Sequence, residues 1–392
     1  MTALLLQPLT IRGMTMPNRV ALSPMTMTSG ADGMTKDWHY QHYGSFAASG
    51  VGFITIESTA IAPDGRIGAA CLGLYSDETE DSMRRLVRYI KSLGPAKVGI
   101  QLFYSGRKGS LPVRWAPREQ LPIEQGGWET VAPSPIPFRA GWRPPREATP
   151  EDITRLRSAW IDAARRAVAA GFDAVELHSA HGYGLHPWLS TVTNRRADQY
   201  GGSVENRMRF PLEVIRGIRK VIPHSMPLGM RISAVDGVDG GIVLEESIAY
   251  VLAAKGEGID YVCVSTGGAV ADFRLPPAPG FQVPYAEEIR RATGVITRAV
   301  GLIYDPHQAE AILQSGKADF VALGRTLLDD PRWVFHAAEA LGEAPPYPRQ
   351  YGQLRPERWP REFVRTPETE RMLRTGVIAV SPELLQRASA AS

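Results

Sequence analysis

The chain has 392 residues, of which 44% are apolar and 22% are charged, which is the composition of an ordinary globular protein. The formal net charge is only +3, and no basic block interleaved with aromatic residues indicates nucleic-acid binding. The two cysteines, Cys71 and Cys263, exclude a disulfide framework and a four-cysteine zinc or iron–sulfur site within one chain. They suit a reducing compartment, and we expect a cytoplasmic protein.

The apolar run at the start of the chain, MTALLLQPLTIRG, is too short for a secretory signal, and Pro8 interrupts it. No stretch reaches the roughly 18 uninterrupted apolar residues that a membrane-spanning helix needs. We therefore expect no membrane partner.

Short apolar runs alternate with helical patterns along most of the chain. The predicted strands are 20–25, 52–59, 97–103, 174–180, 228–233, 261–266, 295–301 and 320–325. The predicted helices lie near 79–93, 149–171, 205–221, 245–257, 285–293 and 306–315. This alternation predicts a single-domain (β/α)₈ barrel. The rival is a doubly wound open sheet, and its dinucleotide-binding form is disfavoured because no G-x-G-x-x-G follows the first strand.

Two segments do not follow the alternation. Residues 104–148 are rich in Pro and Trp and predict an elaborated loop after the third strand, of the kind that covers a barrel's active site. From about 345 the chain is rich in Pro and Arg, and one more helix is expected near 367–376. We divide the chain into a barrel at 1–345 and an extension at 346–392. The extension could be solvated, pack on the surface or reach a second copy of the chain in a homo-oligomer.

Polar residues gather where the predicted strands end, which is the face of a barrel that carries chemistry. Gln101 lies near the end of the third strand, Glu176 and His178 share one face of the fourth, and Arg231 lies on the fifth. Burying these groups costs free energy unless they meet partners or a polar ligand.

Glycines end the last two strands, at Gly301 and at Gly324, which Arg325 follows. Free backbone N–H groups after strands seven and eight are the usual phosphate site of a barrel, although either glycine could simply permit a tight turn. A phosphate beside Gln101 and Arg231 suits flavin mononucleotide, because an amide both donates and accepts and a guanidinium stabilises negative charge on a reduced ring. A buried ion pair between Arg231 and Glu176 is an equal alternative at this point.

The segment HSAHGYGLHPW follows the fourth strand and contains His178, His181, Tyr183 and His186. Two histidines three residues apart could bind a metal with Glu176, but such a site is incomplete. Tyr183 by itself would more often be a packed aromatic residue. His186, directly before a proline, is interpreted as structural.

The longer segment HSAHGYGLHPWLSTVTNRRADQYGGSVENRMRFPLEV, residues 178–214, closely resembles the signature segment of the Old Yellow Enzyme family of flavin-dependent ene-reductases. Other stretches occur in the family's order: LLQPLTIRGMTMPNRVALSPMTM, IESTAIAPDGR, GIQLFYSGRK, MRIS, STGG and LGRTLLDDPRW. The resemblance covers roughly residues 4–340. Long motifs in a fixed order are far more specific than a single pair of histidines or glycines.

The resemblance implies a non-covalently bound FMN that NADH or NADPH reduces, without a metal. Its FMN-binding residues would be Pro24, Met25, Thr26, Ser58, Gln101, Arg231, Gly301, Gly324 and Arg325. His178 and His181 would hold the oxygen of an enone or nitro substrate, and Tyr183 would deliver a proton. The alternatives are a desaturase or nitro-compound reductase on the same scaffold, a barrel that binds flavin without turnover, and a metal-dependent hydrolase.

The sequence departs from the bacterial thermophilic-like branch of the family at several positions. Thr26 stands where that branch commonly has cysteine, and Thr28 where it often has a tyrosine that reaches the substrate. Phe103 occupies a position that controls pocket width, so a narrow substrate range is expected. In the tail, Gln353 stands where that branch can pass an arginine into a neighbouring active site.

Overall fold

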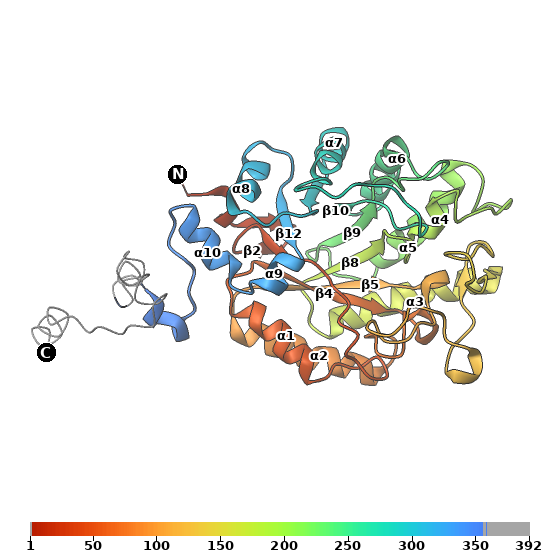
Figure 1. The fold of residues 1–392 in the computed structure, drawn as a ribbon, viewed down its shortest axis with the longest axis horizontal. Coiled ribbons are helices and arrows are strands. Elements are labelled where there is room, and N and C mark those ends of the chain that lie inside the picture. Colours follow the sequence, from red (N-terminus) through yellow and green to blue (C-terminus); the bar gives the residue numbers. More distant parts are fainter. Residues whose placement is uncertain (1, 356–357, 359–392) are drawn as a thin grey trace, which may run out of the picture. The chain divides into compact units, whose positions relative to one another are not determined.

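The computed structural model describes residues 2–355 and 358. Its centre is a closed barrel of parallel strands in the order β10-β11-β12-β3-β4-β5-β8-β9, so β12 closes against β3 (Figure 1). The strands are β3 (Val20–Leu22), β4 (Phe53–Ala60), β5 (Lys97–Phe103), β8 (Ala174–Ser179), β9 (Leu228–Ser233), β10 (Tyr261–Ser265), β11 (Ile296–Ala299) and β12 (Phe320–Leu323). This confirms the predicted (β/α)₈ barrel and excludes the open sheet.

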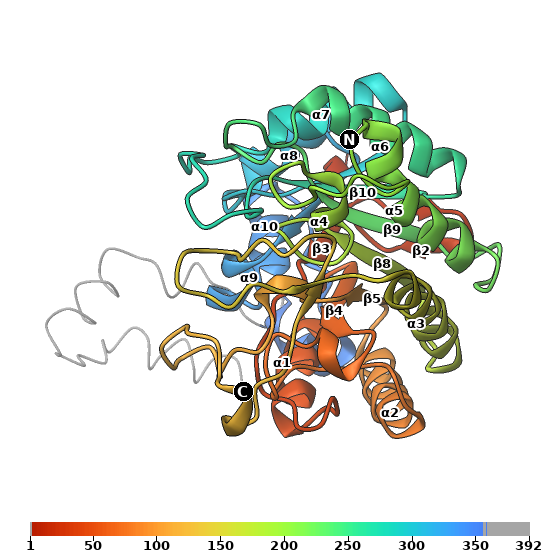
Figure 2. The same cartoon turned by 90° about the vertical axis from the view of Figure 1, so that its right-hand side faces the viewer.

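Helices surround the strands (Figures 1 and 2). They are α1 (Asp37–Ala47), α2 (Asp77–Leu93), α3 (Pro150–Ala169), α4 (His186–Leu189), α5 (Val204–Arg219), α6 (Leu244–Gly256), α7 (Val283–Thr293), α8 (Pro306–Gln314), α9 (Arg325–Asp329) and α10 (Trp333–Ala340). The helical patterns predicted α2, α3, α5, α6, α7 and α8. They did not predict α1, because its buried face carries His39, His42 and Tyr43 where an aliphatic stripe is the usual signal.

The start of α3 shows how closely local sequence determines these elements. The Thr149 side chain accepts a hydrogen bond from the Asp152 backbone N–H, and the Asp152 carboxylate accepts one from the Thr149 N–H. Pro150 occupies the first helical position, where its missing N–H is not needed. Two residues beyond the helix, Gly171 adopts a φ of +88° that turns the chain toward β8.

A hairpin that the sequence patterns did not predict closes one end of the barrel. Its strands are β1 (Leu9–Ile11) and β2 (Met14–Met16), which pair antiparallel. The hairpin packs in one cluster with side chains from the first residues of the barrel strands, among them Phe53, Tyr261 and Phe320. The N-terminal end of the barrel is therefore filled, and a ligand site must lie at the opposite end.

A buried ion pair between Glu176 and Arg298 crosses the interior of the barrel. The two side chains are 1% and 0% exposed. The Glu176 carboxylate also accepts hydrogen bonds from Gln101 Nε2 at 2.9 Å and from the Tyr261 hydroxyl at 3.1 Å. The alternative that paired Glu176 with Arg231 is therefore wrong, because Arg298 reaches the carboxylate from inside the barrel.

The residues from 104 to 148 contain more order than the sequence indicated. Within them, β6 (Val131–Ala132) pairs with β7 (Arg146–Glu147), and short 3₁₀ turns form at Gly106–Lys108 and Ile123–Gln125. This segment, called the insertion below, follows β5 as predicted (amber in Figure 2).

The chain divides into two compact units, Met1–Pro346 and Tyr347–Ser392. In the second unit a 3₁₀ helix forms at Arg349–Leu354, whereas the helix expected near 367–376 lies outside the described residues. The division at 345/346 and the homo-oligomer remain predictions. No helix within residues 2–355 is long and apolar enough to cross a membrane.

The Glu176–Arg298 pair generates a stability prediction. Arg298→Met should lower the free energy of unfolding by roughly 3–5 kcal/mol, because it leaves a buried carboxylate without its cation. Urea unfolding checks this, with the double variant Glu176→Gln/Arg298→Met as the control that removes both charges. The double variant should lose less than Arg298→Met alone, and a loss below about 1 kcal/mol in the single variant would show that the pair is unimportant.

Candidate active site

Two adjoining cavities lie at the C-terminal ends of the barrel strands. The first, called the His/Tyr cavity, has a volume of about 280 Å³. Among its lining residues are Thr26, Thr28, Ser58, Gln101, Phe103, His178, His181 and Tyr183. The second, called the Gly/Arg cavity, has a volume of about 490 Å³ and is lined by Gly301, Gly324 and Arg325. Pro24, Met25 and Arg231 line both, so every residue predicted for the site lies in one continuous region.

His178, His181 and Tyr183 form one wall of the His/Tyr cavity. The ring centroids of His178 and His181 are 5.6 Å apart, and those of His178 and Tyr183 are 5.4 Å apart. His178 Nδ1 accepts a hydrogen bond from the Ala180 backbone N–H at 3.2 Å, so its remaining proton sits on Nε2. Phe103 is fully buried with its ring centroid 6.0 Å from that of Tyr183, where it limits the width of the cavity.

The protonation of these side chains follows from burial. Burial, and then the nearby Arg231 cation, hold the pKa of both His178 and His181 well below the usual histidine value. Burial raises the pKa of Tyr183. At neutral pH the wall therefore presents two neutral imidazoles, each with one N–H, and a phenol that keeps its proton.

The turn after β8 is held in a conformation that few side chains tolerate. His181 has a φ of +56°, and a Cβ on Gly184 would lie 1.9 Å from the His178 carbonyl oxygen. Two other non-glycine residues with positive φ, Thr28 and Leu302, also line the two cavities. Such strain persists only where the surrounding structure enforces it, and it concentrates at functional sites.

His186 is one of the groups that enforce this turn. Its Nδ1 accepts a hydrogen bond from the Gly182 N–H at 2.8 Å, and its Nε2 lies 3.0 Å from Asp236 Oδ1. The other oxygen of Asp236 accepts from the Ser190 hydroxyl at 2.5 Å. His186 is therefore structural, as the sequence indicated.

Lys108 is a buried residue of the site that the sequence analysis missed. Its ammonium donates to the His181 carbonyl at 2.7 Å and to the Gly268 carbonyl at 3.2 Å, and it lies 4.1 Å from the centroid of the Tyr183 ring. Burial, followed by repulsion from Arg107, lowers the pKa of Lys108 to about 7. The only signal was an Arg–Lys pair, Arg107 and Lys108, a few residues after an apolar strand, which surface loops also show.

Arg231 has an unsatisfied donor. Its Nε is buried and has no hydrogen-bond partner among the described residues. Gln101 beside it is fixed, because its oxygen accepts from the Ser58 hydroxyl at 2.7 Å while its nitrogen donates to Glu176. Because Arg231 lines both cavities, its unsatisfied guanidinium nitrogen makes it a candidate partner for an acceptor atom of a ligand.

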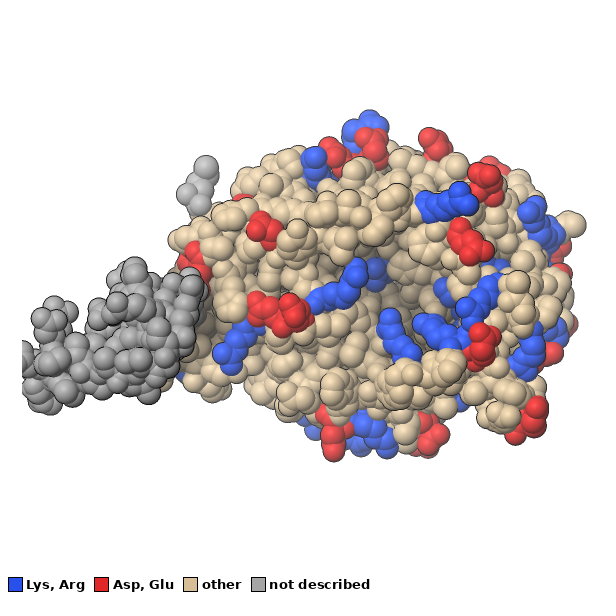
Figure 3. All heavy atoms as spheres, viewed as in Figure 1, with Lys and Arg blue, Asp and Glu red and all other residues tan. Residues whose placement is uncertain are grey.

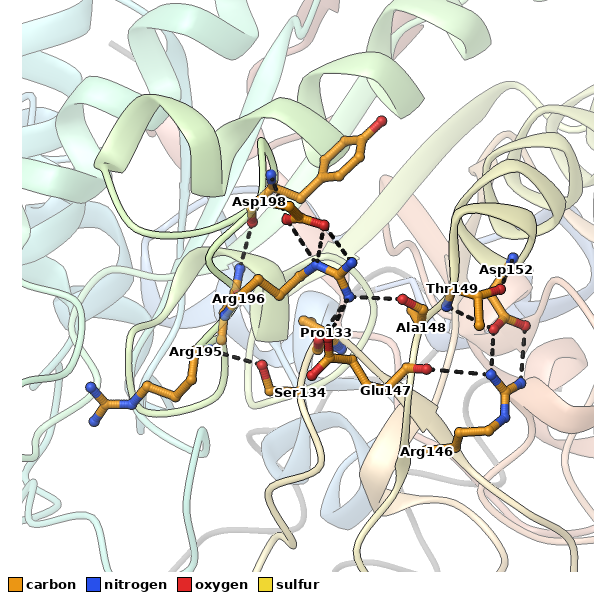
Figure 4. A network of polar contacts seen from close by, with 12 residues as sticks. Pro133, Ser134, Arg146, Glu147, Ala148, Thr149, Asp152, Arg195, Arg196 and Asp198 are labelled. Carbon is orange, nitrogen blue, oxygen red and sulfur yellow. Dashed lines mark hydrogen bonds and ion pairs between the residues drawn. The ribbon is translucent and has the colours of Figure 1, made fainter.

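Arg196 anchors the insertion beside the site (Figure 4). Its guanidinium is buried and donates to the carbonyls of Pro133 at 3.1 Å and Ala148 at 2.8 Å, the residues that directly follow β6 and β7. The same guanidinium binds Asp198 in the segment between α4 and α5. The insertion is therefore attached to the segment that follows the histidine turn.

The alternative of a metal held by His178, His181 and Glu176 lacks a third ligand among the described residues. Both oxygens of Glu176 are engaged, by Gln101 on one side and by Tyr261 and Arg298 on the other. Within the part of the chain that the structure describes, no group of three or more His, Cys, Asp or Glu side chains could hold a metal ion.

Glu57 supports the backbone of the segment that carries Thr26 and Thr28. It is fully buried, and its Oε2 accepts from the Met27 N–H at 2.8 Å. The Tyr43 hydroxyl and His39 Nε2 lie 3.3 Å and 3.5 Å from its other oxygen. Burial raises the pKa of Glu57 to about 8.

The raised pKa of Glu57 generates a pH prediction. The folded protein binds a proton that the unfolded chain releases near its ordinary carboxyl pKa, so this stabilisation is present at low pH and is lost as the pH rises through about 8. Glu57→Gln should remove this loss. Between pH 5 and 8 the wild type should lose about 1 kcal/mol or more of unfolding free energy relative to that variant, as measured by urea titration. Glu119→Gln, at an exposed position, is the control, and parallel curves for wild type and Glu57→Gln would contradict the assignment.

Comparisons with known proteins show to which family the chain belongs. Residues 4–343 match the model of the NADH:flavin oxidoreductase / NADH oxidase family. The chain is 44% identical over 344 residues to an NADPH dehydrogenase of Geobacillus sp. (strain WCH70), which covers 87% of this chain and 96% of that protein.

Among solved structures, morphinone reductase superposes with a TM-score of 0.72 at 28% identity, covering 87% of this chain and 90% of that one. A 2-naphthoyl-CoA reductase complex shares the fold with a TM-score of 0.79 at 24% identity, and this chain spans 53% of that protein. The chain therefore belongs to the NADH:flavin oxidoreductase / NADH oxidase family, and it is an FMN-dependent NAD(P)H oxidoreductase of the Old Yellow Enzyme type.

Proposed function

We propose that the enzyme reduces C=C bonds conjugated to a carbonyl or nitro group. The observation that carries this proposal is the shared wall of His178, His181 and Tyr183 in the His/Tyr cavity, which meets the Gly/Arg cavity at Arg231. Two neutral N–H donors and one protonated phenol around a small cavity are the groups that such a reduction requires.

The residues of the two cavities fit FMN. Arg325 with the backbone of Gly301 and Gly324 would hold the phosphate, since neither cavity has an acidic residue in its lining. The unpartnered Arg231 Nε would donate to the ring, and Gln101 and Ser58 would hydrogen-bond it. The rest of the FMN contacts would come from Pro24, Met25 and Thr26. Bound FMN, after reduction by NADH or NADPH, supplies a hydride from its N5 atom.

His178 and His181 would hold the carbonyl or nitro oxygen of the substrate. Negative charge builds on that oxygen when a hydride arrives at the β-carbon, and fixed N–H donors stabilise it without reorganising. One such donor typically contributes about 2.7–4 kcal/mol to lowering the barrier. Besides the proposed substrate contact, the His181 ring contacts Ser265. Its Nε2 lies 2.7 Å from the Ser265 hydroxyl, and this contact orients the ring.

Tyr183 would provide the proton that completes the reduction. Its raised pKa keeps the phenol protonated at neutral pH, and Lys108 against its ring helps to fix its position. Phe103 and Thr28 would border the substrate, and the bulk of the Phe103 ring favours narrow substrates.

Phenol binding tests directly whether His178 and His181, together called the clamp below, hold the substrate oxygen. A para-substituted phenol should bind the oxidised holoenzyme as its phenolate and produce a long-wavelength charge-transfer band. His178→Ala and His181→Ala should each weaken binding by about 100-fold or more, because each loses one donor to the phenolate oxygen. His186→Ala serves as a control for general disturbance of the turn. If both clamp variants keep the band at wild-type affinity, the clamp assignment is wrong.

Replacing Tyr183 separates the two half-reactions. Tyr183→Phe should slow re-oxidation of the reduced enzyme by an enone by about 10²–10⁴-fold, since the acid is lost, while reduction by NAD(P)H stays within a few-fold of wild type. Anaerobic stopped-flow absorbance measures both rates. Equal losses in the two half-reactions would show that the phenol has a structural role.

A further inference from the structure

The insertion brings two arginines to the cavity, Arg114 and Arg118, and the predicted flavin contacts use neither of them. Arg114 lines both cavities, and Arg118 lines the His/Tyr cavity only. Both side chains are exposed, unlike the buried His178, so they lie toward the mouth of the cavity. Arg114 Nη1 is 3.4 Å from the Thr26 carbonyl oxygen, which places it above the segment that carries the predicted flavin contacts.

Within residues 2–355, no carboxylate pairs with these two guanidinium groups. Among the described residues neither forms an ion pair, and neither cavity has Asp or Glu in its lining. The adjacent carboxylate of Glu119 is engaged by Arg139 at 2.7 Å. Together with Arg231, three arginines face a cavity of about 280 Å³. Figure 3 shows Lys and Arg side chains bordering the hollow in this face of the molecule.

The predicted cofactor uses only part of this positive charge. In the proposed binding mode, Arg325 would bind the FMN phosphate in the Gly/Arg cavity, and Arg231 would bind the flavin ring. Arg118 lies instead beside Tyr183, where its charge and a side-chain hydrogen bond to the phenol both oppose the effect of burial on the pKa of Tyr183. An anion beside Arg118 would therefore be part of the molecule that occupies the His/Tyr cavity.

We propose that Arg114 and Arg118 form an anion subsite at the mouth of the His/Tyr cavity, and that the natural acceptor is an activated alkene that also carries a carboxylate. This inference rests on the proposed function, because it assumes that the alkene is held by His178 and His181. A carboxylate matches the planar fork of a guanidinium and can bind it through two parallel hydrogen bonds. The rival source of negative charge is the 2′-phosphate of NADPH.

Equilibrium binding to the holoenzyme tests the subsite without turnover. The two probes are 4-hydroxybenzoate and 4-methylphenol, which share the phenol and differ in the para carboxylate. Their dissociation constants come from the change in flavin absorbance in the wild type, Arg114→Gln, Arg118→Gln and the double variant. Arg165→Gln, at an exposed position away from the cavities, is the matched control.

We expect Arg118→Gln to weaken 4-hydroxybenzoate about tenfold, the double variant to weaken it further, and 4-methylphenol to change less than twofold. Raising the ionic strength should reduce the preference of the wild type for the carboxylate. In turnover, kcat/KM for 4-oxopent-2-enoate should fall more in the variants than kcat/KM for its methyl ester does, because any effect of Arg118 on Tyr183 is common to both substrates. An unchanged ratio of the two phenol dissociation constants overturns the proposal.

A second binding experiment tests whether the two arginines bind the 2′-phosphate of NADPH instead of a substrate carboxylate. The non-reactive tetrahydro forms of NADP and NAD should lose affinity equally, if at all, in Arg118→Gln. Selective loss of the NADP form, with an unchanged phenol ratio, would assign the charge to the coenzyme and overturn the carboxylate proposal. Failure of 4-methylphenol to give a charge-transfer band in the wild type would instead contradict the histidine clamp, so the two failures are distinguishable.

Discussion

The carboxylate of Glu176 determines which cation of the barrel is available to a ligand. Its two oxygens are used by Gln101, Tyr261 and Arg298 in the closed interior. A buried charge must be paired, and Arg298 provides that pairing from within the barrel. Arg231, on the neighbouring strand opposite His178, is left with an unsatisfied donor at the cavity wall. Arg231 is therefore available for the contact with the flavin ring that we propose.

The histidine turn is the second constraint, and it depends on residues that would not contact a substrate. His186 accepts a hydrogen bond from the Gly182 N–H and is itself held by Asp236. Lys108, in the insertion, donates a hydrogen bond to the His181 carbonyl. These contacts maintain the left-handed backbone at His181. A loose turn would place the two imidazoles with an uncertainty that a hydrogen-bonded clamp cannot tolerate, since donor geometry decides how well charge is stabilised. In the proposed function, the supporting residues would therefore position the two imidazoles for the substrate oxygen.

Much of this arrangement could be predicted from the sequence because it depends on local patterns. The alternation of apolar runs and helices predicted the barrel, the capping residues Thr149 and Pro150 predicted the start of α3, and the strand ends predicted the polar face. The long segment from His178 predicted the family, and the family predicted which side chains line the two cavities.

The remaining features arise from contacts between distant parts of the chain. The choice between Arg231 and Arg298 as the partner of Glu176 depends on which residues face inward at the same level of the barrel. Burial of Lys108 and Glu57 depends on packing by other segments, so their shifted pKa values have no sequence signal. The same holds for Arg114 and Arg118, whose segment has no helical or strand period and is held by later residues of the insertion, such as Arg139, which donates to the Arg118 carbonyl.

Anaerobic stopped-flow of the reduced holoenzyme tests most directly whether the enzyme reduces activated C=C bonds. The reduced flavin is mixed with a panel of cyclic enones, nitroalkenes and saturated ketones, and its re-oxidation is followed by absorbance. We expect rapid, saturable re-oxidation by enones or nitroalkenes, and none by saturated ketones. Absence of re-oxidation by every activated alkene, together with reduction of the oxidised flavin by saturated ketones, would contradict this expectation and show that the site catalyses desaturation.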